Sequence, residues 1–194
     1  AVWAQRQLPP DSYDFRRFAS AYLLDTTRPI DRPPAGPVPA FAYGTALWWE
    51  FLTVRHDTHL MVELLEAWQT LDDDDAMLRA MQEVVESRSD SIIGAWLQFS
   101  TYNLATGPRA GELDSYRDAA YLGEILAEAE GAYIQDDNRY YPMTTTYYRI
   151  DHPGGALYWG QEKTDGALNF SLHPVIGGGV DGPVGDAIDQ WDGA

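Results

Sequence analysis

The 194-residue sequence contains no cysteine, so it can form no disulfide bond and carry no thiol chemistry. Basic residues are scarce, because 13 Lys and Arg stand against 30 Asp and Glu and give a formal net charge of −17. This excess of negative charge argues against nucleic acid or an anionic membrane as the main partner. No apolar run reaches the length of a transmembrane helix, so no membrane insertion is expected.

Three common catalytic motifs are also missing: a Gly-rich phosphate loop, a serine nucleophile elbow and an HExxH helix. Hydrophobic residues make up 45% of the chain and include seven Trp, which is ample for a folded core. The acidic composition fits an extracellular, a calcium-binding or a salt-adapted protein equally well. Because the sequence begins with Ala1, we expect a processed or excised portion of a longer precursor that is secreted or displayed at the cell surface.

Apolar residues recur at three- and four-residue steps through residues 41–107, the spacing of one helix face. One such series is Met77, Leu78, Met81, Val84 and Val85, and another is Met61, Leu64, Leu65, Trp68 and Leu71. Short polar residues fall where helix N-caps belong, at Asp57 or Thr58, at 73–75 and at 89–91. Residues 1–12 are expected to be extended or looped because Pro9 and Pro10 interrupt any helix, whereas 114–130 is expected to be helical.

The character of the sequence changes after residue 131. Residues 140–150 are rich in Thr and Tyr, which favour strands, and two further strand-like runs cover 156–163 and 167–173. Asp165-Gly166 between the last two runs is typical of a hairpin turn. The sequence therefore predicts an α+β fold: a helical domain over 1–130, a bundle of about five or six helices, followed by a β-rich segment over 131–194 with a small antiparallel sheet and a Gly- and Asp-rich tail.

Three clusters could bind a metal ion. His56 and His59 flank Asp57 at an expected helix start, and two imidazoles at that spacing can share a face and ligate a transition metal. A structural or surface role is the more common reading of so short a motif. Calcium is possible at the acidic runs 72–75 and 136–138, although helix capping explains the first of them as well.

Aromatic residues could instead line a sugar-binding groove. The candidates are Trp48, Trp49, Trp68, Trp96 and Trp159, with Glu50 or Glu63 as carboxylates. Aromatics at helical spacing usually belong to the core, and nothing in the sequence fixes two carboxylates at the separation that a glycosidase needs. The residues by themselves therefore define no complete active site.

Phe41, Tyr43 and Gly44, then Leu47-Trp48 and Phe51-Leu52, resemble the helix that follows the zinc helix in gluzincin metallopeptidases. The run Phe99–Gly107, which contains Asn103, resembles a later segment of large secreted bacterial proteins of this type, including myxobacterial ones. Ala1-Val2-Trp3 resembles the stretch that carries the third zinc ligand. The resemblance covers roughly residues 1–173. Trp48 and Trp49 of the possible groove, together with Asn103 of the resembling segment, are the candidate binding residues.

The resemblance implies that the zinc ligands precede Ala1, so zinc would belong only to a fuller protein. Related aminopeptidases stabilise the oxyanion with a tyrosine at the position of Phe41, and Tyr43 is the candidate substitute here. The leading interpretation is the C-terminal portion of a secreted zinc-metallopeptidase-like protein, inactive alone. Its partners would be the upstream part of the same precursor or another chain, and its substrate a peptide. The alternative is a non-catalytic extracellular binding or assembly module, and a glycan-active enzyme is a third.

Overall fold

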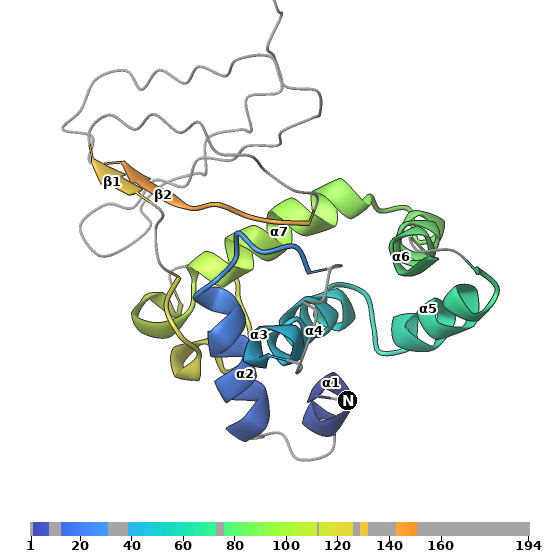
Figure 1. Cartoon of the computed structure of the whole chain (residues 1–194), viewed down its shortest axis with the longest axis horizontal. Helices are drawn as coiled ribbons and strands as arrows, with labels where there is room; N and C mark the ends of the chain where they lie inside the picture. Colours follow the sequence, from blue (N-terminus) through green and yellow to red (C-terminus); the bar gives the residue numbers. More distant parts are fainter. Residues whose placement is uncertain are drawn as a thin grey trace, which may run out of the picture.

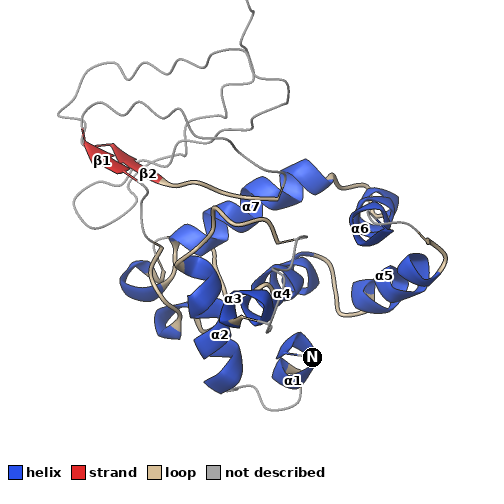
Figure 2. Ribbon diagram, viewed as in Figure 1, coloured by secondary structure: helices blue, strands red, loops and turns tan. Residues whose placement is uncertain are grey.

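The computed structural model describes residues 2–7, 13–30, 39–72, 76–111, 113–125, 129–131 and 143–150, and these form a helical bundle (Figures 1 and 2). The helices are α1 (Val2–Arg6), α2 (Tyr13–Leu23), α3 (Ala40–Gly44), α4 (Ala46–Arg55), α5 (Leu60–Gln69), α6 (Ala76–Ser87) and α7 (Ile92–Leu104). Two 3-10 turns follow, η1 (Gly107–Arg109) and η2 (Ala119–Tyr121). The helical part of the predicted fold is thereby confirmed. Among the described residues, no helix is both long and apolar enough to cross a membrane.

The predicted antiparallel sheet is not seen in the part of the chain that the structure describes. The strands among the described residues are β1 (Ala129–Gly131) and β2 (Tyr148–Ile150), and these two strands pair in parallel. Ala129 lies opposite Tyr148, and Gly131 opposite Ile150. The two later strand-like runs lie outside the described residues, so the rest of the sheet remains a prediction.

The core is centred on aromatic contacts between α4 and α7. In Figure 1, α7 runs along one side of α2, α3 and α4. Trp48 of α4 is fully buried, with its ring centroid 5.0 Å from that of Trp96 and 5.1 Å from that of Phe99. Phe51 stacks on Trp48 at 5.5 Å. Offset and edge-to-face rings at these distances add stabilisation to the burial of apolar area, so these two helices are firmly joined.

A glycine sets how closely α3 approaches α2. A Cβ atom at Gly44 would lie 2.2 Å from the carbonyl oxygen of Phe18 and 2.8 Å from Cβ of Tyr22. Only glycine leaves room for this contact. The sequence pattern predicts one helix starting near Tyr43, but the chain forms two short consecutive helices, α3 and α4, that meet at Thr45.

Two predictions about regular structure are wrong. Residues 2–6 form α1 instead of a loop, because Val2 is buried in the core and Trp3 donates from Nε1 to Oγ1 of Thr53 at 3.4 Å. The helix expected over 114–130 is reduced, within the described residues, to the short turn η2.

Tertiary bonds explain the second error. The Asp118 carboxylate accepts from Arg16 Nε at 3.1 Å, and the Gly123 N–H donates to Ser20 Oγ at 2.9 Å. The Gly123 carbonyl accepts from Thr106 Oγ1 at 2.9 Å. The backbone groups of Gly123 are thus satisfied by α2 and by Thr106 after α7 instead of by a helical ladder, while the Asp118 side chain ties this segment to α2.

The N-cap predicted at Ser91 is confirmed, because Ser91 Oγ accepts from the N–H of Gly94 at 3.0 Å at the start of α7. The N-cap of α5 is His59, one residue after the predicted Asp57 or Thr58. The Asp57 carboxylate still accepts from the N–H groups of His59 at 2.7 Å and Leu60 at 3.2 Å, where the helix begins. Both side chains satisfy backbone donors that have no partner inside a helix.

Candidate functional site

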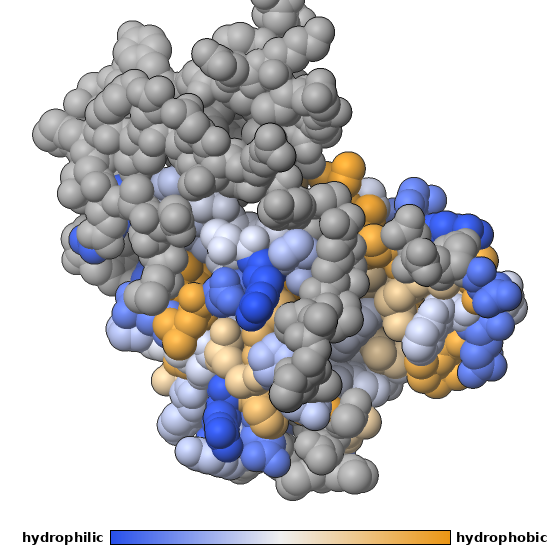
Figure 3. All heavy atoms as spheres, viewed as in Figure 1, coloured by the Kyte–Doolittle hydropathy of each residue, from blue (hydrophilic) through white to orange (hydrophobic). Residues whose placement is uncertain are grey.

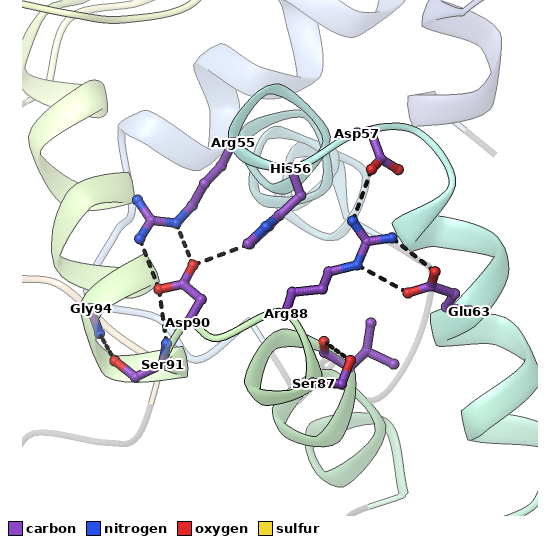
Figure 4. A network of polar contacts seen from close by, with 10 residues as sticks. Arg55, His56, Asp57, Glu63, Ser87, Arg88, Asp90, Ser91 and Gly94 are labelled. Carbon is purple, nitrogen blue, oxygen red and sulfur yellow. Dashed lines mark hydrogen bonds and ion pairs between the residues drawn. The ribbon is translucent and has the colours of Figure 1, made fainter.

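Ion pairs join the α4–α5 loop to the α6–α7 loop, and we call this cluster of Arg55, His56, Asp57, Glu63, Arg88 and Asp90 the loop network (Figure 4). Arg88 reaches Glu63 through Nε at 3.0 Å and Nη2 at 2.9 Å. Its Nη1 donates to Asp57 at 2.9 Å. One guanidinium thus binds both Asp57, just before α5, and the first turn of that helix.

Asp90 holds the other half of the loop network. Its carboxylate accepts from Nε and from Nη2 of Arg55, the second bond being 2.8 Å long, and from the N–H of Ser91 at 2.8 Å. The hydrogen bonds from Arg55 lower the pKa of Asp90 to about 2. Asp90 is therefore a carboxylate at all ordinary pH values, held by two fixed donors from α4.

The metal-binding prediction for His56, Asp57 and His59 gains no support from their placement. His56 Nε2 is buried and lies 3.1 Å from Asp90 Oδ2, but the angle between the two groups does not allow a hydrogen bond. His59 is exposed and faces Glu63 at 3.6 Å, while Asp57 faces Arg88. The three side chains have three different partners, and in the described ranges no group of three or more His, Asp or Glu side chains could hold a metal ion.

A second polar cluster is buried along α7, where one side of the helix carries Trp96, Ser100 and Asn103. Residues 143–147 run along this side. Trp96 Nε1 donates to the Thr144 carbonyl at 3.2 Å, and Ser100 Oγ lies 2.8 Å from Thr145 Oγ1. Tyr147 donates its hydroxyl to the Ser100 carbonyl at 2.9 Å. This extended segment is thus hydrogen-bonded to the helical bundle.

Asn103 lies at the centre of the buried cluster and is completely inaccessible. Its Oδ1 accepts from the Tyr116 hydroxyl at 2.7 Å, while its Nδ2 has no hydrogen-bond partner among the described residues. The Tyr22 hydroxyl is likewise buried without a partner there. Burial raises the pKa of Tyr22, Tyr116 and Tyr147. These hydroxyls are neutral and can act only as hydrogen-bond donors or acceptors.

The remaining predicted site residues differ in how far their side chains are exposed to solvent. Trp48 is fully buried and donates from Nε1 to Met81 Sδ at 3.2 Å, so its ring belongs to the core and not to an open groove. Trp49 is partly buried against the core. Tyr43 is 39% exposed, with its ring 4.9 Å from that of Phe18. Tyr43, the residue predicted to stabilise the oxyanion, therefore lies at the surface.

Sequence reasoning did not single out Arg88, Asp90, Tyr116 or Tyr147. Arg88 and Asp90 flank the positive-φ residue Ser89 in a tight turn, and a basic and an acidic residue around a helix junction are only a weak signal. Comparison with protein-family models, with curated proteins and with solved structures finds no match for this chain.

Proposed function

We propose that this chain is the C-terminal, non-ligating part of a zinc-metallopeptidase-like protein, with a helical bundle that supports a catalytic unit carried by preceding residues. The described residues offer no set of zinc ligands, so we assign the chain a supporting role and derive no reaction step through the metal. The antiparallel sheet over 140–173 belongs to the same proposal.

The observation that carries the proposal is the position of α1. This helix contains Val2 and Trp3, the residues that resemble the stretch after the third zinc ligand. Val2 is buried, and Trp3 is hydrogen-bonded to Thr53 of α4, the helix that continues the Tyr43-Gly44 pattern. Two of the three segments that carry the resemblance are therefore packed together, as parts of one site would be.

Exposure favours Tyr43 over Phe41 as the residue that contacts substrate. Phe41 is buried, with the guanidinium carbon of Arg28 5.1 Å from its ring centroid and the Tyr22 ring at 5.5 Å. Tyr43 is two residues further along α3 and reaches the surface. A hydroxyl there can donate a hydrogen bond to a developing oxyanion.

The test begins with the coding region upstream of Ala1. The proposal expects an HExxH helix and a glutamate about three residues before Ala1. The longer protein should contain zinc and hydrolyse peptides, and the 194-residue chain alone should do neither. Tyr43→Phe in the longer protein should lower kcat by about a hundredfold, whereas Tyr121→Phe, at another exposed tyrosine, should leave it unchanged. An upstream region without the motif would refute the proposal.

A further inference from the structure

Helix α5 is apolar on two sides, although only one of them faces the core. Leu60 and Leu64 are buried against the bundle. Val62, Leu65 and Trp68 recur at three-residue steps beside this buried pair and remain 47%, 46% and 43% exposed. We call these three residues the outer stripe. A helix that is apolar around most of its circumference is normally covered on both sides.

The outer stripe differs from the other exposed apolar residues because its members are contiguous. Val54 on α4 and Ile93 on α7 are also exposed, but each stands alone on its helix, and single exposed apolar residues are common on protein surfaces. In Figure 3, apolar and hydrophilic atoms lie side by side at the end of the molecule where Figure 1 places α5. Clustered apolar exposure of this kind marks an interaction site.

Charge narrows the choice of partner. Glu66 lies exposed beside the outer stripe, Asp72 follows the helix at an exposed position, and the whole chain carries a formal charge of −17. A second copy would place like charges together, which costs binding energy. It would also need roughly 800 Å² per partner for a stable dimer, and a helix of 10 residues offers one stripe only about 15 Å long.

We propose that the outer stripe binds a short amphipathic helix of another protein, whose apolar residues pack on Val62, Leu65 and Trp68 and whose lysines or arginines face Glu66 and Asp72. The apolar contacts supply the buried area, and the acidic residues Glu66 and Asp72 select for a cationic partner. The stripe belongs to α5 and does not involve Tyr43 or α1, so this inference is independent of the peptidase proposal.

The experiment uses a synthetic amphipathic peptide of about 14 residues, made of Leu and Lys, with a Leu and Glu peptide as its charge control. Binding is measured by isothermal titration calorimetry on the full chain. The Lys peptide should bind, and the triple variant Val62→Gln, Leu65→Gln and Trp68→Gln should weaken it by at least about tenfold. The matched variant Val54→Gln with Ile93→Gln should bind as the wild type does. Circular dichroism checks that both variants are folded.

Three results would overturn the inference. The first is equal affinity of the triple variant and the wild type for the Lys peptide, which would reduce binding to unspecific charge attraction. The second is equal or tighter binding of the Glu peptide. The third is a wild-type dimer in light scattering that becomes monomeric in the triple variant, because a second copy would then be the occupant.

Discussion

The guanidinium of Arg88 donates two parallel hydrogen bonds to the carboxylate of Glu63, from Nε to Oε2 at 3.0 Å and from Nη2 to Oε1 at 2.9 Å. Glu63 lies in the first turn of α5, and Arg88 follows the last residue of α6. The third bond of the same guanidinium goes to Asp57, which accepts hydrogen bonds from the N–H groups at the start of α5. The start of α5 and the end of α6 are therefore joined through a single side chain.

Replacing Arg88 by Lys should weaken this junction. A lysine keeps the charge but cannot form the planar, two-pronged contact with a carboxylate. We expect Arg88→Lys to lower the free energy of unfolding by up to about 1 kcal/mol, measured by urea denaturation. Arg28→Lys is the control, because Arg28 donates only one hydrogen bond to a carboxylate among the described residues, to Asp25 at 3.2 Å, and is more exposed than Arg88. Equal effects of the two substitutions would show that the paired geometry contributes nothing.

Two buried tyrosines should respond in opposite ways to loss of the hydroxyl. Tyr116 donates to Asn103 Oδ1, so Tyr116→Phe leaves a buried acceptor unpaired and should cost about 1–3 kcal/mol. The Tyr22 hydroxyl has no partner among the described residues, so Tyr22→Phe should be neutral or stabilising. Thermal and urea unfolding of both variants test this. A Tyr22→Phe loss as large as that of Tyr116→Phe would contradict it.

Asp90 should make stability depend on acid pH. Hydrogen bonds from Arg55 lower its pKa from the ordinary 3.8 to about 2 in the folded chain. A group with a depressed folded pKa stabilises the protein above its ordinary pKa, and that contribution is lost as the pH falls towards the folded value. Asp90→Asn should therefore be less stable than the wild type near neutral pH, and the gap should narrow between about pH 4 and about pH 2. Unfolding free energies across that range provide the measurement, with Asp114→Asn at an exposed position as control. A gap that stays constant with pH would contradict the assignment.

Local rules predicted much of the helical part. The periodicity of apolar residues marks α5, α6 and α7, and short polar residues mark the N-cap at Ser91 and, to within two residues, the start of α5. These features depend on neighbours within a few positions, so the sequence contains them directly. The prediction of a helix over 114–130 is wrong for the opposite reason, because Asp118 and Gly123 are hydrogen-bonded to α2, about a hundred positions away in the sequence.

The candidate sites were less accessible to prediction for a similar reason. His56 and Asp57 look like a metal motif when read alone, but their partners Asp90 and Arg88 lie more than 30 positions further on. Trp48 is of a residue type that is common in ligand-binding grooves, but it is buried in the core. Only the packing of α4 on α7 distinguishes these two roles. Asn103 is a predicted binding residue, but the spacing of residues along the sequence does not show that it is surrounded by buried tyrosines.

The segment that runs along α7 also bonds to the beginning of the chain. The N–H of Thr145 donates to the Thr26 carbonyl at 2.9 Å, and the N–H of Ile30 donates to the Met143 carbonyl at 3.4 Å. Joining these residues closes a loop of about 120 residues, and such long-range contacts slow folding. During synthesis, α2 and α7 emerge well before the residues that complete their polar contacts. A nascent chain that has grown only to residue 130 therefore carries the helices without the segment that bonds to Trp96 and Ser100, and the bundle is finished only after Tyr147 has left the ribosome.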